Sequence, residues 1–429
     1  MTYDLNNILV SLIFILAHLL LFIFNFKLFG KRVMHPAILF SLLWFVVCSV
    51  HFIFSFTILD KLAPISISTY TVFFVGTVFF SLGAFIVQTV PRKNIQSSNS
   101  NQALKITESI SMTLRLLLLA IILIGLPFYI QATYRIFIAS QIDDFFAGVR
   151  TAITYYEEDL GPVKYFLSLS FVVFAVNLIC FLRERTMLNR VVLLLCLVIT
   201  LTYSVLATGR TFFLMMLTIF IGISYLLNKK FSIKKFAWLT LGFMIFFMGI
   251  GIFWGKGGDK ESSMKENIPV ATEITATYLV LSLNALDHEI THPIAQKTEG
   301  ENTLRFFIKI GRQIGLVENK RVINLVKEFL FIPYGTNVYT YYNDYINDFG
   351  RLYAWFMLAL FAALHTWMHN IAVNKKSLRY ILYYSFLLYP LVMTFFQDQY
   401  MSLFSTWVQI FVYVELILLA NKLFISKKW

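Results

Sequence analysis

A single arginine stands in a very short connection between two apolar segments. Arg210 belongs to the sequence ATGRT (residues 207–211), and apolar runs near residues 191–207 and 211–228 flank it. A cation at a membrane boundary costs solvation free energy unless an anion accompanies it, and the planar guanidinium suits a phosphate or diphosphate. We therefore predict that Arg210 contacts a phosphate group. The alternative is an arginine that only extends to lipid head groups.

A second candidate site is the polar, aromatic segment 333–350, with the sequence PYGTNVYTYYNDYINDFG. If residues 340–349 form a helix, Thr340, Asp344 and Asp348 share one of its faces. Hydroxyls, amides and carboxylates beside flat aromatic rings suit a sugar, which offers hydroxyl groups and an apolar ring face. An interfacial aromatic belt is the alternative, but a belt does not explain the Asn and Asp residues between the tyrosines. The segment therefore predicts a saccharide site.

His288, Glu289 and His292 form an H-E-x-x-H motif, which in zinc proteases supplies two metal ligands and a base. Both histidines must then lie on one intact helical face. Pro293 follows directly and disfavours helical geometry at the residue before it, and Asp287 precedes the motif. We therefore predict that His288 and His292 do not bind zinc.

The segment 131–161 carries Arg150 in the sequence FFAGVR and an acidic run at residues 157–159. The acidic run is most simply a solvated surface. Arg150 is a second candidate for contact with a phosphate.

The composition indicates that lipid, and not water, surrounds the elements that must position these residues. The chain has 429 residues, of which 58% are hydrophobic and only 14% are charged, and its mean hydropathy is +0.72. Soluble domains carry about 25% charged residues. A soluble fold, a disordered chain and a disulfide scaffold are therefore excluded.

Apolar runs of about 20 residues can span a bilayer as helices. The sequence predicts an all-α protein with about eleven transmembrane helices, near residues 5–26, 36–58, 66–90, 114–131, 163–182, 191–207, 211–228, 236–254, 352–372, 378–396 and 401–421. The organisation expected is helices 1–8 in residues 1–254, one large loop with short helices in residues 255–351, and helices 9–11 in residues 352–429.

The net charge of +13 is distributed in a way that indicates membrane topology. Alternate connections hold more than half of the 36 Lys and Arg residues, but among the 23 acids only Glu108 and Glu184. The positive-inside rule makes these connections cytoplasmic. The N-terminus and the loop 255–351 are then exterior, and the charge predicts no nucleic-acid partner.

The topology, the Thr-Gly-Arg at residues 208–210 and the segment 335–350 (GTNVYT…DFG) together resemble the oligosaccharide repeat unit polymerases. These are the Wzy-type enzymes of O-antigen and capsule assembly. Members of that family often carry another glycine four residues after the Asp-Phe-Gly glycine, where this chain has Ala354.

The resemblance implies a membrane glycosyltransferase fold (GT-C-like) in the bacterial inner membrane and no metal or other cofactor. The substrate would be an undecaprenyl-diphosphate-linked oligosaccharide, polymerised at the outer face of the membrane, with a chain-length regulator as a further partner. Arg210 would stabilise the diphosphate leaving group, and Asp348 would be the base or orient the acceptor hydroxyl. The expected substrate contacts are Arg150, Asn337, Tyr339, Thr340, Asp344 and Arg351.

Three alternatives stay open. An O-antigen ligase would share the architecture. A flippase for lipid-linked oligosaccharides would need charged groups in many spans, and the predicted spans carry almost none. A membrane zinc metalloprotease would need His288 and His292 as ligands.

Overall fold

The computed structural model is helical and describes most of the chain. The described residues are 4–30, 32–89, 109–156, 158–227, 264–293, 298–317 and 327–426, with isolated positions between 238 and 250. A single pair of two-residue strands, β1 (Leu330–Phe331) and β2 (Gly335–Thr336), is present in this part of the chain.

Ten helical segments among the described residues are long and apolar enough to cross a membrane. The protein is therefore a polytopic helical membrane protein, as predicted. The eighth predicted span, 236–254, lies largely outside the described residues. The ten are α1 (Leu5–Leu28), α2 (Pro36–Phe54), α3 (Ile67–Thr89), α4 (Met112–Ser140), η1 with α6 (Gly161–Lys164 and Tyr165–Arg183), α7 (Met187–Leu206), α8 (Arg210–Leu227), α13 (Arg351–Lys375), α14 with η2 (Leu378–Val392 and Met393–Phe395) and α15 (Phe404–Ser426).

The helices begin where the sequence supplies suitable caps. The Asp4 carboxylate accepts a hydrogen bond from the Asn7 N–H at the start of α1, and Pro36 begins α2, where its missing N–H costs nothing. Leu9, Leu16 and Leu20 of α1 are exposed. Exposed apolar faces of this extent are unusual in water-soluble monomers and are typical of surfaces that contact lipid.

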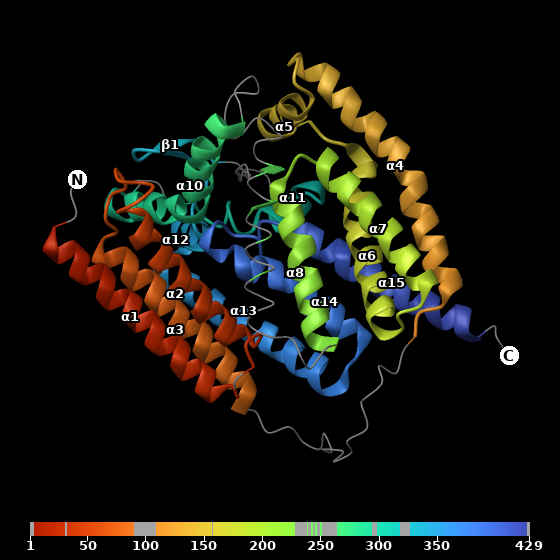
Figure 1. Ribbon diagram of the computed structural model, residues 1–429, viewed down its shortest axis with the longest axis horizontal. Helices are drawn as coiled ribbons and strands as arrows, with labels where there is room; N and C mark the ends of the chain where they lie inside the picture. Colours follow the sequence, from red (N-terminus) through yellow and green to blue (C-terminus); the bar gives the residue numbers. More distant parts are fainter. Residues whose placement is uncertain are drawn as a thin grey trace. The chain divides into compact units, whose positions relative to one another are not determined.

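The chain forms two compact units, which are described separately. Unit 1 comprises Met1–Gln102, Gly257–Asn370 and Pro390–Phe404, and unit 2 comprises Ala103–Lys256, Ile371–Tyr389 and Ser405–Trp429. Unit 1 contains α1, α2 and α3 packed side by side, with α10 (Met264–Thr291) against α2 and α3 (Figure 1). It also contains α11 (Arg305–Gln313), α12 (Tyr341–Phe349) and most of α13.

Within unit 1, an apolar cluster and hydrogen bonds hold helix α10 against α2 and the segment that follows α2. The cluster joins α10 to the segment after α2 and consists of Leu59, Leu62, Ala276, Val280 and Leu281. One turn further on, Asn284 bonds to His51 of α2 at 2.8 Å and donates to the Ala63 carbonyl at 2.7 Å. Helix α2 and the segment that follows it therefore fix the position of α10.

Helix α12 fits against α3 because α3 has a glycine at the contact. A Cβ atom at Gly76 would lie 2.1 Å from the Tyr342 hydroxyl oxygen, so any other residue at this position would require the Tyr342 ring or α3 to shift. The Tyr342 ring also lies 5.5 Å from Trp44 and 5.7 Å from Phe73. Aromatic packing of this kind adds to the hydrophobic burial, so the span helices fix one face of α12.

Unit 2 contains α4, α6 and α7, which pack against one another, with α8 against α6 and α7. Arg115 of α4 donates to the side-chain oxygens of Asn177 and Asn189, at 2.8 and 2.7 Å. Glu415 of α15 forms an ion pair with Arg379 of α14 at 2.7 Å and accepts from the Tyr383 hydroxyl. Pairing reduces the cost of burying these polar groups.

Two predictions about the connections need correction. The segment 131–161 is not simply a loop, because α4 continues through Ser140 and α5 (Phe145–Tyr155) follows. Apolar residues at 136–138 extend the helical surface of α4 beyond the predicted span. The loop 255–351 was expected to contain only short helices, but Leu330 pairs with Thr336 across a turn that contains Pro333. Residues 318–326 lie outside the described residues.

Candidate functional site

The polar segment forms the helix on which its shared polar face depends, and that face is buried. Helix α12 runs from Tyr341 to Phe349, with Thr340 as its N-cap. Thr340, Asp344 and Asp348 are only 1%, 7% and 4% exposed. A buried carboxylate is costly unless hydrogen bonds or a cation compensate it, so the partners of the two aspartates indicate what each one does.

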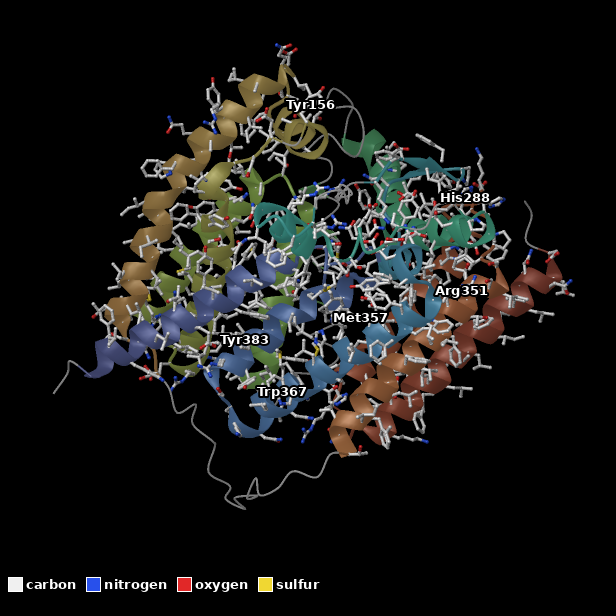
Figure 2. The ribbon with its side chains drawn as sticks, turned by 180° about the vertical axis from the view of Figure 1, so that it is seen from behind. Tyr156, His288, Arg351, Met357, Trp367 and Tyr383 are labelled. Carbon is white, nitrogen blue, oxygen red and sulfur yellow. The ribbon has the colours of Figure 1, made fainter. Side chains whose placement is uncertain are left out.

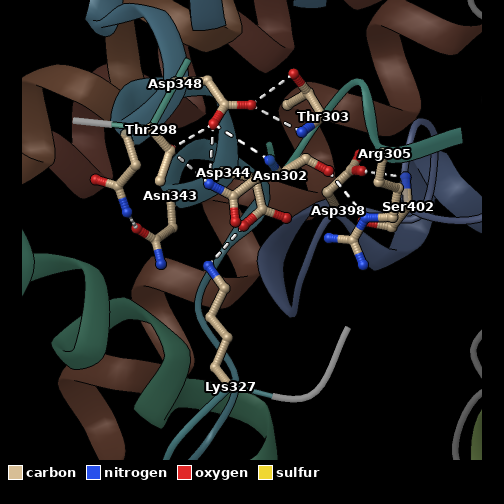
Figure 3. A network of polar contacts seen from close by, with 11 residues as sticks. Thr298, Asn302, Thr303, Arg305, Lys327, Asn343, Asp344, Asp348, Asp398 and Ser402 are labelled. Carbon is tan, nitrogen blue, oxygen red and sulfur yellow. Dashed lines mark hydrogen bonds and ion pairs between the residues drawn. The ribbon is translucent and has the colours of Figure 1, made fainter. Parts of the chain in front are cut away.

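Asp348 is saturated with donors from its own chain (Figure 3). Its Oδ1 accepts from the Thr298 hydroxyl at 2.5 Å, from the Asn302 side chain at 2.9 Å and from the Asn302 N–H at 3.3 Å. Its Oδ2 accepts from the Thr303 N–H and hydroxyl, at 2.8 and 2.7 Å. With both oxygens engaged in this way, the geometry favours a role in anchoring the segment 298–303 over the role of base that we expected.

Asp344 has a different partner, a lysine that we did not identify from the sequence. The Lys327 ammonium lies 2.5 Å from Oδ1 of Asp344 (Figure 3). The same ammonium lies 5.0 Å from the centre of the Tyr339 ring, in cation–π geometry. Burial, with the charges of Glu289 and Glu328, raises the pKa of Tyr339 to about 12, so its phenol stays protonated and can donate a hydrogen bond.

A third buried aspartate, Asp398, lies in the short segment between α14 and α15. It is 2% exposed, and it accepts hydrogen bonds from the Tyr345 hydroxyl at 3.1 Å and from the backbone N–H groups of Tyr400 and Ser402. Burial and the charge of Asp344 raise its pKa to about 6. Asp398 therefore ties α12 to the connection between the last two spans.

Arg305 is a buried cation beside this polar network. It is the first residue of α11, is 7% exposed, and donates from Nε to the Asn302 carbonyl at 2.9 Å. Its Nη1 is buried without a hydrogen-bond partner. Figure 3 shows the guanidinium beside Asp398 and Ser402.

The remaining predicted contacts in unit 1 differ in their surroundings. Thr340 Oγ1 is buried without a hydrogen-bond partner, which makes it available to a ligand hydroxyl. Asn337 is half-buried in the segment before α12. Arg351, at the start of α13 (Figure 2), is exposed and donates to the Ser68 hydroxyl at 3.0 Å. The structure therefore brings Tyr339 and Asp344 together around Lys327, with Thr340 at the N-cap of α12. Arg351 is instead engaged with Ser68 at the start of α3.

Arg210 and Arg150 belong to unit 2. Arg210 is the first residue of α8 and is 5% exposed. The turn before it is tight: Thr208 has a left-handed backbone (φ 55°), and a Cβ on Gly209 would lie 2.7 Å from the Phe212 ring. The predicted close turn is confirmed. Arg150 lies half-buried in α5, with its Nη1 buried and lacking a hydrogen-bond partner.

The H-E-x-x-H residues lie at the end of α10, where Figure 2 shows His288. The helix ends at Thr291, and the two imidazoles stack with their centres 4.8 Å apart. His292 Nδ1 is bonded to the Thr291 hydroxyl at 3.0 Å, and Asp287 accepts from the N–H and hydroxyl of Ser66. Among the described residues, no group of three or more His, Cys, Asp or Glu could hold a metal ion.

Lys327, Arg305 and Asp398 are the site residues that sequence reasoning missed. Asp398 had a usable signal, because it is the one charged residue in the short polar stretch (QDQ) between the last two predicted spans. Lys327 and Arg305 had no such signal in the sequence, since both lie in the predicted loop 255–351 among several other Lys and Arg residues. Only the fold shows that these two cations lie beside the buried aspartates.

Comparison with known proteins gives one informative relative. The chain is 27% identical over 99 residues to a protein from Escherichia coli (strain K12) described as "Putative O-antigen polymerase". The matched segment makes up 23% of this chain and 25% of that protein. No family model matches the chain, and no solved structure matches it.

Proposed function

We propose that this chain is a membrane glycosyltransferase that polymerises lipid-diphosphate-linked oligosaccharide repeat units into a surface polysaccharide. Three observations support the proposal: the polytopic helical fold, the short match to a protein named as an O-antigen polymerase, and the polar cluster around α12. The cluster carries the proposal, because buried carboxylates, amides and tyrosines lie together outside the ten candidate spans. Such a cluster can bind and activate a sugar hydroxyl.

In the proposed reaction, a hydroxyl of the acceptor saccharide attacks the anomeric carbon of the donor. A new C–O bond forms as the bond from that carbon to the diphosphate breaks, through an oxocarbenium-like transition state. The diphosphate oxygen takes the electron pair, and its growing negative charge requires stabilisation. We assign this task to Arg210, with Arg150 as an assisting contact.

The proton of the acceptor hydroxyl needs a base, and we assign this role to Asp344. Asp348 is a poor base, because five donors of its own chain surround its two oxygens. Asp344 has the Lys327 ammonium at one oxygen. Tyr339, Thr340 and Asn337 are the proposed contacts to the sugar.

The proposal places the reaction at the outer face of the bacterial inner membrane, on a GT-C-like fold. This location follows from the charge asymmetry of the connections and from the resemblance, both of which make residues 255–351 exterior. The lipid carrier is then undecaprenyl diphosphate, and a chain-length regulator is the expected partner. The proposed mechanism uses no metal.

The test is deletion of the gene, followed by gel electrophoresis of the surface polysaccharide. Loss of the ladder with one repeat unit retained on the lipid A core supports a polymerase. Loss of all repeat units indicates a ligase or a flippase instead, and an unchanged ladder excludes all three. Complementation with the wild-type gene is the control.

A further inference from the structure

We infer that Lys327 is a positioning residue that balances the charge of the Asp344 carboxylate and orients it for proton transfer. The inference rests on the proposed function and extends it to a residue outside the sequence motifs. It starts from one contact, the 2.5 Å separation between Lys327 Nζ and Asp344 Oδ1.

The pair is not an ordinary surface ion pair. The side chains of Lys327 and Asp344 are only 22% and 9% exposed. Exposed pairs contribute little because water screens them, whereas a buried carboxylate that loses its cation carries a large desolvation cost. The Lys327 ammonium therefore offsets the cost of burying the Asp344 carboxylate.

The Tyr339 ring restrains the lysine. The centre of the ring lies 5.0 Å from Lys327 Nζ, which adds a cation–π contact to the ion pair. Two independent contacts reduce the freedom of a flexible side chain. An ammonium fixed at Oδ1 leaves Oδ2 of Asp344 as the oxygen that we assign to the acceptor proton.

The other charges named around the Lys327–Asp344 pair are negative, so Lys327 supplies the positive charge that balances Asp344. Glu289 of α10 lies near Lys327. Burial raises the pKa of Glu289, and the positive charge of Lys327 partly opposes that shift. Asp398, from the segment before α15, repels Asp344, and Glu328 adds further negative charge near Tyr339. Removing the ammonium would therefore leave Asp344 among like charges, and protonation would be its simplest response.

Lys327 itself forms no bond in the reaction. The acceptor hydroxyl gives its proton to Oδ2 of Asp344, its oxygen bonds to the anomeric carbon, and the diphosphate leaves with the electron pair. The lysine keeps its protons throughout. Its effect should therefore appear in kcat and in the pH dependence, and not in the affinity for the acceptor.

The experiment is an elongation assay with the purified full-length protein and a synthetic lipid-diphosphate-linked repeat unit. Lys327→Met should lower kcat by about 10–10²-fold, with the KM of the acceptor changed less than about twofold, and should move the acid limb of the pH–rate profile to higher pH. Lys327→Arg keeps the charge and should restore most of the rate. Lys309→Met, at an exposed lysine of α11, is the matched control and should behave as the wild type.

A second comparison separates positioning from a loss of folding. If Lys327 acts through Asp344, then adding Lys327→Met to Asp344→Asn should lower kcat no further. A normal kcat and pH profile in Lys327→Met would overturn the inference, and so would an equal loss of rate in Lys327→Arg. Absence of elongation by the wild-type protein would contradict the proposed function instead.

Discussion

Thr303 donates both its backbone N–H and its hydroxyl to a single oxygen, Oδ2 of Asp348, at 2.8 and 2.7 Å. The two residues are 45 positions apart in the chain. One carboxylate therefore joins the end of α12 to the segment that leads into α11. These two hydrogen bonds hold Asn302 and Arg305 beside the polar cluster, so the role of Asp348 is to position other residues of the site.

The role of Asp348 predicts a stability defect. Asp348→Asn replaces one acceptor oxygen with an NH₂ group, and leaves at least one buried donor of Asn302 or Thr303 without an acceptor. Each such donor costs about 1–3 kcal/mol, so the midpoint of chemical unfolding in detergent should fall measurably. Asp60→Asn, at an exposed carboxylate of the same unit, should leave it unchanged. An Asp348→Asn protein of normal stability that makes no polymer would instead assign Asp348 to the chemistry.

Arg210 should be indispensable for polymer formation. Arg210→Ala removes both the charge and the fork of donors, and should lower the elongation rate by at least about 10²–10³-fold, as the loss of one oxyanion-type donor does elsewhere. Arg210→Lys keeps the charge but not the planar geometry, so it should be impaired and not neutral. The measurement is the polysaccharide ladder at matched expression, with Arg185→Ala, at an exposed arginine of the same unit, as the control. A full ladder from Arg210→Ala would show that the arginine only contacts lipid.

Asp398 should make stability depend on pH in a defined window. Its pKa is raised from 3.8 to about 6, so the folded protein holds a proton that the unfolded chain has already released. Its contribution to stability is therefore greatest below about pH 4 and decreases as the pH rises to about 6. The unfolding temperature of the wild type, minus that of Asp398→Asn, should fall over this range and then stay constant. A difference that does not change with pH would contradict the assignment.

His288 and His292 should be dispensable. The stacked rings, the bond from His292 to Thr291 and the engagement of Asp287 with Ser66 all describe a structural helix end. Replacement of both histidines by alanine should leave the polysaccharide ladder intact, and chelators should not reduce the elongation rate. Stoichiometric zinc in the purified wild type that disappears in the double variant would refute this prediction.

The membrane-spanning part of the fold could be predicted from the sequence because hydropathy is a local property. Ten predicted spans agree with helices of the structure to within a few residues at most of their ends. The exception is α4, which extends to Ser140, because hydropathy marks where an apolar run ends and not where a helix ends. Helix α12 was predictable for a similar reason, since the spacing of Thr340, Asp344 and Asp348 is helical.

The roles within the site could not be predicted, because they depend on partners distant in the chain. Asp344 and Asp348 lie four residues apart on one face of α12 and look equivalent in the sequence. Their partners, Lys327 and the segment 298–303, give one of them an ion pair and the other a set of five donors. No local pattern encodes that difference.

The most direct test of the central claim is elongation by the purified protein in lipid nanodiscs, with one synthetic lipid-diphosphate-linked repeat unit as the sole substrate. Mass spectrometry of the products should show a series that increases by whole repeat units, each still attached to a single lipid diphosphate, with one free lipid diphosphate released for each addition. If the substrate remains a single repeat unit under conditions where the protein is folded and inserted, the chain is not a polymerase.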